Sequence, residues 1–290
     1  MKREAALFGR RGSNRRAVLG SILFFSVSLF VLLWSTLPPI NWLKYRNPKT
    51  TALMEYREKA AAARNRKIPR RLNWVPLGKI SPHLVKAVVM AEDDKFFEHD
   101  GLDWEAIKKA LESNLKRKKL AFGGSTITQQ LAKNIFLSPR KTLLRKIREG
   151  LLAYQIDKEL TKKRILELYL NVAEWGSGLY GAEAASLAYF NKHASELTPA
   201  EAIRLASVLP SPRKNAPQDN SRRWINKKRE DLLARFLKRG WVDEAGFAQA
   251  RFDLGFSSGP VAGPSPALPQ ETGGGSIREE NQQEDHDEDY

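Results

Sequence analysis

The sequence predicts an all-α fold that is attached to a membrane by a single N-terminal helix. Residues 17–37 contain no charged side chain. Between residues 81 and 240, apolar residues recur every three to four positions, which is the spacing of one helix face. No stretch of useful length alternates apolar and polar residues, as a half-buried strand would. Together these observations favour helices over sheets and an anchored N-terminus.

The uncharged segment at residues 17–37 is long enough to cross a bilayer core of about 30 Å at about 1.5 Å per residue. Trp34 and Trp42 lie where an interfacial belt of aromatic residues is expected. The alternative is a cleaved signal peptide, whose apolar region would be about 7–15 residues long and would end in small residues. Two prolines follow here instead. Six basic residues against one acid in residues 1–16 predict a cytoplasmic N-terminus, with the rest of the chain across the membrane.

The net charge of the chain is +16, from 49 Lys and Arg against 33 Asp and Glu. Residues 271–290 contain eight acids and one arginine, a net charge of −7, so the rest of the chain carries +23. A charge this large implies a polyanionic partner, either nucleic acid or an anionic membrane. The predicted anchor favours the membrane and argues against nucleic acid. The absence of cysteine excludes disulfides, thiolate metal sites and a cysteine nucleophile.

Composition divides the remainder of the chain into three parts. Residues 38–74 mix proline, basic residues and an alanine-rich stretch, and we expect a membrane-proximal stalk with one helix at 51–66. Residues 75–256 are predicted to form the folded domain. Beyond residue 256 large apolar residues almost disappear, so residues 257–290 are predicted to be a disordered acidic tail.

Capping signals mark where helices of the domain begin. Ser81 before Pro82 begins a helix that ends at Glu92. Thr126 with Gln129 forms a capping box for a helix that runs to residue 136. Further helices are expected at residues 103–119, 140–160, 162–173, 200–209 and 221–239.

The first stretch with candidate catalytic residues is Ala91–Gly101, where Glu92, Asp93 and Asp94 follow directly after an apolar run. A carboxylate held beside an apolar wall has a raised pKa, which suits it to accept or donate a proton. The alternative is an ordinary acidic helix end before a turn. His99 is interpreted as structural support for this acidic loop.

The second stretch is Gly123–Asn134, in which two glycines precede a capped helix. Such a helix start allows close backbone approach and suits an anion. The alternative is a capped helix with a polar face. The candidate substrate-binding side chains here are Ser125, Thr126, Gln129, Gln130, Lys133 and Asn134.

The third stretch places Lys141, Arg145 and Glu149 at i, i+4 and i+8, so they form one stripe on a helix. The alternative is a solvent-facing ion pair worth about 0.2–0.5 kcal/mol. The opposite side of the same helix carries Leu143, Leu144, Ile147 and Leu151.

Together the three stretches supply two separated carboxylates, Glu92 and Glu149, and several cations. Enzymes that act on glycosidic bonds commonly use two carboxylates, one on each side of the reacting bond. Cations suit a phosphate leaving group. Beside a membrane, this combination indicates a sugar that is linked through pyrophosphate to a lipid.

These motifs resemble those of the peptidoglycan glycosyltransferases of family 51, and the chain is most similar to the monofunctional biosynthetic transglycosylases. The likeness covers about residues 75–215. The matching stretches are residues 92–101, 123–130, 145–149, 162–171 and 180–185.

The resemblance implies a lysozyme-like α-helical fold in the bacterial inner membrane and polymerisation of lipid II into β-1,4-linked glycan strands. Glu92 would be the general base that takes the proton from the acceptor hydroxyl, and undecaprenyl pyrophosphate would leave with inversion. Glu149 would be the second essential acid. Lys133, Lys141 and Arg145 would neutralise the pyrophosphate.

Two candidate substrate-binding positions depart from the family pattern, because Lys109 and Lys141 stand where many members have arginine. A lysine ammonium group is a point charge and does not make the bidentate phosphate contacts of a planar guanidinium group. No cofactor is expected. A divalent cation (Mg or Mn) that joins Asp93 or Glu92 to a phosphate stays an alternative.

The expected partners are lipid II, the growing glycan strand and the inner membrane, with cell-division or cell-wall synthesis proteins as further candidates. Two other functions stay open at this point. One is a lysozyme-like enzyme that cleaves glycans, and the other is a non-catalytic, membrane-anchored scaffold.

Overall fold

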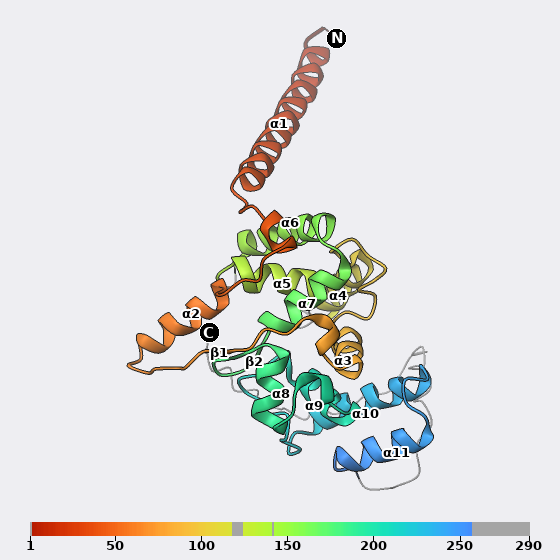
Figure 1. The fold of residues 1–290 in the computed structure, drawn as a ribbon. Coiled ribbons are helices and arrows are strands. Elements are labelled where there is room, and N and C mark those ends of the chain that lie inside the picture. The colour runs from red at the N-terminus through yellow and green to blue at the C-terminus, as the bar shows by residue number, and fades with distance from the viewer. Residues whose placement is uncertain (1, 118–123, 141, 257–290) are drawn as a thin grey trace, which may run out of the picture.

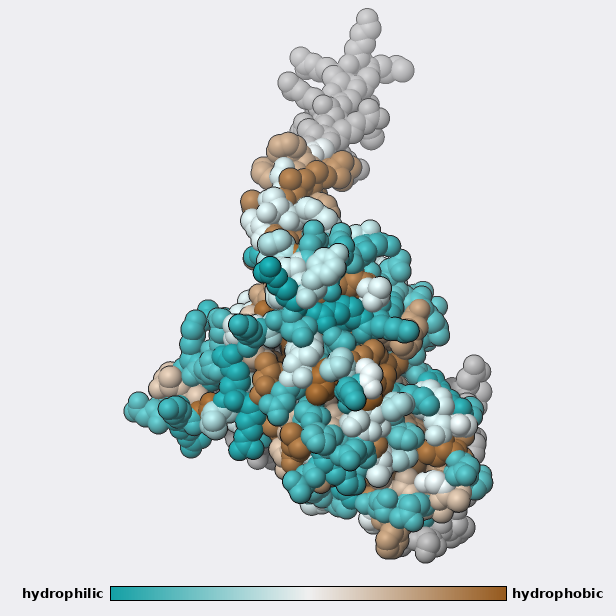
Figure 2. All heavy atoms as spheres, viewed as in Figure 1, coloured by the Kyte–Doolittle hydropathy of each residue, from teal (hydrophilic) through white to brown (hydrophobic). Residues whose placement is uncertain are grey.

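The computed structural model describes residues 2–117, 124–140 and 142–256 (Figure 1). The predicted tail at residues 257–290 and the candidate Lys141 therefore lie outside the described residues. Helix α1, Lys2–Ser35, projects away from the rest of the chain (Figure 1). Its segment Val18–Ser35 is long and apolar enough to cross a membrane. Where α1 is coloured in Figure 2, hydrophobic residues gather on it, whereas the surface of the domain is mainly hydrophilic.

The segment predicted as a stalk packs against the domain. Leu43 and Met54 are fully buried, and Lys44 Nζ lies 2.5 Å from Glu159 Oε2. Thr51 caps the expected helix here, because its side chain accepts a hydrogen bond from the backbone of Met54. The elements of this segment and its continuation are η1 Asn41–Lys44, α2 Ala52–Ala62, β1 Arg71–Leu72 and η2 Leu77–Lys79.

The domain is helical, as predicted, and its helices begin at the expected caps. Ser81 caps α3, the predicted capping box of Thr126 with Gln129 is present, and Thr198 forms a second one with Glu201. Two helices, α8 and α11, are additional to those predicted. The helices are α3 Pro82–Glu92, α4 Trp104–Arg117, α5 Ile127–Phe136, α6 Leu143–Glu159, α7 Lys162–Val172, α8 Ala182–Phe190, α9 Pro199–Val208, α10 Arg223–Lys238 and α11 Glu244–Asp253, with the short η3 Ala194–Glu196.

A small sheet of strand order β1-β3-β2 joins the membrane-proximal segment to the domain. β2 spans Glu174–Gly176 and β3 spans Leu179–Tyr180, and they form an antiparallel hairpin. β1 pairs with β3 in parallel, with Arg71 opposite Leu179. Strands of two or three residues are too short to show alternation, which is why the sequence pattern predicts no strand here.

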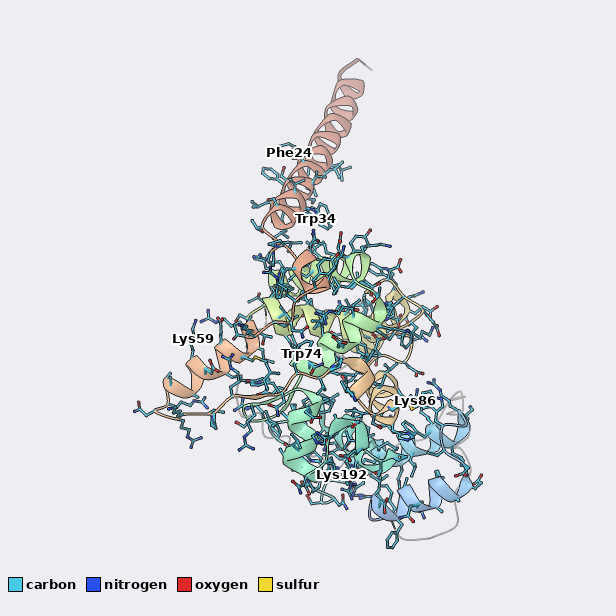
Figure 3. The ribbon with its side chains drawn as sticks, viewed as in Figure 1. Phe24, Trp34, Lys59, Trp74, Lys86 and Lys192 are labelled. Atoms are coloured by element: carbon cyan, nitrogen blue, oxygen red, sulfur yellow. The ribbon has the colours of Figure 1, made fainter. Side chains whose placement is uncertain are left out.

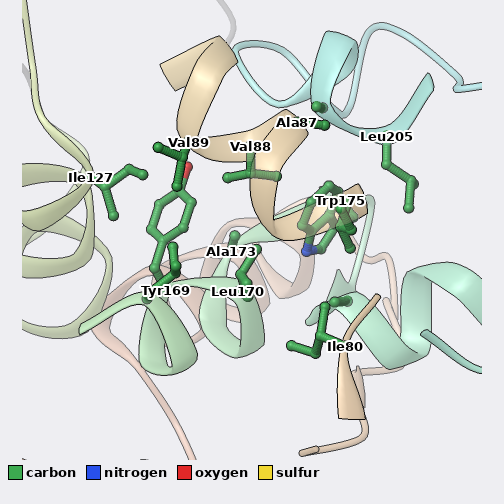
Figure 4. Close-up of a cluster of buried hydrophobic side chains, with 14 of the residues drawn as sticks. Ile80, Ala87, Val88, Val89, Ile127, Tyr169, Leu170, Ala173, Trp175 and Leu205 are labelled. Atoms are coloured by element: carbon green, nitrogen blue, oxygen red, sulfur yellow. The ribbon is translucent and has the colours of Figure 1, made fainter. Parts of the chain in front are cut away.

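The core is built around α3, whose apolar side chains lie between α5 and α7 on one side and α9 on the other. Figure 4 shows Val89 close to Tyr169 and Ile127, whereas Trp175 lies with Ala87 and Leu205. The side chains in Figure 3 fill the space between these helices. This packing holds the C-terminal end of α3, and with it Glu92, in one place.

Candidate active site

Glu92 ends α3 with its side chain only 10% exposed. Its Oε2 atom accepts a hydrogen bond of 3.0 Å from Gln130 Nε2, and Lys228 Nζ lies 3.6 Å from Oε1. The Tyr169 hydroxyl donates to Gln130 Oε1 at 3.0 Å and so fixes the orientation of that amide. Burial raises the pKa of Glu92, while the charge of Lys228 and the Gln130 hydrogen bond act in the opposite direction. The result is a carboxylate that is positioned and tuned to accept a proton.

Asp93 connects the end of α3 to the start of α5. Its Oδ2 atom accepts a hydrogen bond from the backbone N–H of Ile127 at 2.9 Å, and His99 Nε2 lies 2.9 Å from Oδ1. His99 therefore supports the acidic loop, as the sequence indicates. In the described parts of the chain, no group of three or more His, Cys, Asp or Glu residues could hold a metal ion.

Some polar side chains of the second stretch stabilise the start of α5, and others contact residues of the site. Thr126 donates its hydroxyl to the carbonyl of Gly101 at 2.7 Å and, with Gln129, forms the capping box of α5. These two residues position the helix. Ser125, in contrast, accepts a 2.6 Å hydrogen bond from Lys146, and Gln130 reaches Glu92. Asn134 is buried within α5.

Lys133, on α5, is influenced by the charges of both candidate catalytic acids. Burial lowers the pKa of its ammonium group, whereas the charges of Glu149 and Glu92 both raise it. Arg145 and Lys146 act on the same ammonium and lower its pKa. Gln130 hydrogen-bonds Glu92, and Lys146 contacts both Ser125 and Glu149. The three stretches of sequence therefore meet at a single site.

The stripe on α6 faces into the domain. Glu149 is 2% exposed, and its carboxylate pairs with Lys146 and with Arg145 Nη1, the latter at 2.6 Å. On the other side of the helix, Leu143 is 79% exposed. The alternative of a solvent-facing Arg–Glu pair is therefore wrong, because this pair lies at a buried carboxylate. Lys109 is exposed on α4, and its charge helps to lower the pKa of Glu105.

A cavity of about 320 Å³ opens beside Glu92. It lies between the end of α3, Ala106 of α4 and the segment that leads into α5. Its lining includes Gly124, Ser125 and the acids of the 92–94 run. This space leaves room for a ligand beside the Glu92 carboxylate.

Sequence patterns did not identify two site residues, Lys228 and Lys146. Lys228 lies on α10, in a run of three basic residues whose periodicity does not distinguish the one that reaches Glu92. Lys146 is next to Arg145 but outside the i, i+4 stripe, and it nevertheless contacts both Ser125 and Glu149. A search that also considered i,i+3 neighbours on the helix would have identified Lys146, which lies three residues before Glu149.

With the fold and the geometry of the site described, the sequence can be compared with known protein families. Residues 58–237 match the family model described as transglycosylase, so the chain belongs to the transglycosylase family. The match confirms the resemblance seen in the motifs, and it begins within α2.

Relatives give a more specific comparison. A protein from Aromatoleum aromaticum is 48% identical over 201 residues, which cover 69% of this chain and 87% of the relative. One from Nitrosospira multiformis is 45% identical over 213 residues, which cover 73% and 92%. Both are named biosynthetic peptidoglycan transglycosylase.

Proposed function

We propose that this protein is a peptidoglycan glycosyltransferase that polymerises lipid II into β-1,4-linked glycan strands and releases undecaprenyl pyrophosphate. Family membership and the names of its relatives support the class of reaction. The observation that carries the proposal is a pair of acids, Glu92 with a side chain only 10% exposed and Glu149 at 2% exposed, whose charges both act on Lys133.

Glu92 acts as the general base. It takes the proton from the 4-hydroxyl of the acceptor sugar while that oxygen attacks C1 of the donor sugar. The bond from C1 to the pyrophosphate oxygen breaks, its electron pair leaves with the pyrophosphate, and the configuration at C1 inverts. The burial of Glu92 supports this role, because a carboxylate with a raised pKa is a stronger base.

Lys133, Arg145 and Lys146 form the pyrophosphate site. Their charges converge on one region, and phosphate oxygens bind such groups through charge-assisted hydrogen bonds. Glu149 acts as a positioning residue there, because its carboxylate holds Arg145 and Lys146 on the inner side of α6. We expect no cofactor, since these cations supply the charge that the leaving group needs. If EDTA abolishes activity and Mg²⁺ or Mn²⁺ restores it, a metal ion is required instead.

The protein is proposed to be anchored in the bacterial inner membrane, with its N-terminus in the cytoplasm and its domain on the outer side. The apolar face of α6, formed by Leu143, Leu144 and Ile147, is exposed. It lies close to the end of α1, because Arg148 on α6 donates to the carbonyl of Thr36 at 2.9 Å. Figure 1 shows α6 as the helix next to α1. A lipid-linked substrate could then reach the cation cluster while its lipid stays in the bilayer.

The test is polymerisation of labelled lipid II by the full chain and by Glu92→Gln. Loss of the general base should lower the rate by about 10²–10⁴-fold, while the circular dichroism spectrum stays that of the wild type. A wild-type rate in Glu92→Gln contradicts the proposal. Release of soluble fragments from cell-wall sacculi would support a glycan-cleaving enzyme. Full biological activity without either acid would support a scaffold.

A further inference from the structure

A second cavity, of about 50 Å³, lies between α2 and the β2–β3 hairpin. It shares no lining residue with the cavity beside Glu92. A space of this size takes a small polar group, such as a carboxylate, but not a sugar ring. We call it the arginine cavity, because its charged lining residues are Arg57, Arg64, Arg66, Arg213 and the single acid Glu174.

Glu174 is only 7% exposed, and only one of its two carboxylate oxygens has a hydrogen-bond partner among the described residues. Its Oε2 atom accepts hydrogen bonds from Arg57 Nε at 3.1 Å and Nη2 at 3.0 Å. Its Oε1 atom is buried and has no hydrogen-bond partner among the described residues. A buried acceptor without a donor is costly, so this atom points to a missing N–H or O–H group.

The positive charge of the arginine cavity exceeds what Glu174 neutralises. Arg57 pairs with Glu174, and Arg213 attracts the same carboxylate from further away. Among the described residues, neither Arg66 nor Arg213 hydrogen-bonds a carboxylate. The cavity therefore suits a group that is anionic and also brings a hydrogen-bond donor.

A peptide carboxylate meets both requirements, because an amide N–H is always close to it. A phosphate diester offers acceptors only, and its oxygens would face the unpartnered Glu174 Oε1 atom. Position also disfavours lipid headgroups: in Figure 1, α6 and α5 lie between α1 and strand β2, which borders the cavity through Glu174.

We propose that the arginine cavity binds a carboxylate of the peptide carried by the peptidoglycan substrate, with a neighbouring amide N–H donating to Glu174. This inference rests on the proposed function, since it takes the substrate to be peptidoglycan. The cavity would then select substrates by their peptide, at a site separate from the chemistry at Glu92.

The experiment compares lipid II with the same lipid-linked disaccharide lacking its peptide, using the full chain in detergent. We expect the KM of the wild type to be about tenfold lower for intact lipid II, as one or two charge-assisted hydrogen bonds allow. In the double variant Arg66→Gln with Arg213→Gln, the two KM values should become equal at an unchanged kcat. This variant keeps the Arg57–Glu174 pair, so folding should be preserved.

The matched control is Arg223→Gln with Lys238→Gln, which removes two exposed positive charges from α10. It should keep the wild-type ratio of KM values. An equal ratio in the wild type, or a wild-type ratio in the Arg66/Arg213 variant, overturns the inference.

Calorimetry with the free peptide makes the inference testable apart from the proposed function. The wild type and the control should bind the peptide, whereas the Arg66/Arg213 variant and a peptide with amidated carboxylates should show no binding. Inorganic phosphate that binds the wild type when the peptide does not overturns the inference. Absence of any polymer from intact lipid II, with peptide binding preserved, contradicts the proposed function alone.

Discussion

The surroundings of Glu92 disfavour the charged form of its carboxylate. Because burial raises its pKa in the folded protein, the folded state binds this proton more tightly than the unfolded state does. The associated stability is fully present below the ordinary pKa of 4.5 and is lost as the pH rises through the raised value. We therefore expect Glu92→Gln to raise the thermal midpoint at pH 8, with a smaller gain at pH 4. A lower midpoint for the variant at both pH values contradicts this prediction.

Removing the Glu149 carboxylate should lower the stability, in contrast to Glu92→Gln. Glu149→Gln leaves Lys133, Arg145 and Lys146 close together without their shared anion. We expect the free energy of unfolding in urea to fall by about 1–3 kcal/mol. The control is Glu159→Gln on the same helix, whose pair with Lys44 is much more exposed and should contribute less than about 1 kcal/mol. Equal losses in the two variants would show that Glu149 has no special structural role.

At the scale of single elements, the two capping boxes form a matched pair of tests. Thr126 begins α5 beside the site, and Thr198 begins α9 away from it. Either threonine to alanine should lower the free energy of unfolding by about 1 kcal/mol. Thr126→Ala should also lower kcat/KM several-fold, because α5 carries Gln130 and Lys133, while Thr198→Ala keeps wild-type kcat/KM. Similar kinetics in the two variants would mean that the start of α5 does not position the site.

Helix starts were predictable from the sequence, but the orientation of α6 was not. Caps such as Thr126 act within four residues, so a local pattern reveals them. On α6 the pattern defines one apolar face and one face with Arg145 and Glu149, and the usual rule buries the apolar face. In the structure the charged face turns inward, because it packs against α5 and Lys146 contacts Ser125 just before that helix. Such contacts between distant segments leave no trace in periodicity.

The exposed face of α6 predicts a membrane contact rather than a core. Leu143→Gln with Ile147→Gln should reduce the binding of anionic vesicles by a chain that begins at residue 38. The free energy of unfolding of this double variant should differ from that of the unsubstituted chain by no more than about 0.5 kcal/mol per site, as expected of surface positions. Leu152→Ala on the buried side of α6 is the control and should cost about 2–5 kcal/mol without changing vesicle binding. Unchanged vesicle binding in the α6 double variant would remove the proposed contact.

At the scale of the whole molecule, residues far apart in the chain complete both the fold and the site. Lys228 comes from α10 to reach Glu92, and Arg57 comes from α2 to pair with Glu174. Composition alone suggested a stalk for residues 38–74, because prolines and basic residues are typical of a linker. The few apolar residues there nevertheless include Leu43 and Met54, which are fully buried. Packing of this kind depends on the partner surface, so composition cannot reveal it.

This packing predicts where the chain can be shortened. A chain that begins at residue 38 should fold and unfold cooperatively, since it loses only α1 and residues 36 and 37, and with them one hydrogen bond of Arg148. A chain that begins at residue 75 loses Leu43, Met54 and strand β1, and it leaves Glu174 without Arg57. Removing one partner of a buried pair costs about 3–5 kcal/mol, against a total stability of about 5–15 kcal/mol for a typical domain. We therefore expect the shorter chain to show no cooperative transition by circular dichroism. A cooperative transition within a few degrees of that of the longer chain would mean that residues 38–74 are dispensable for the fold.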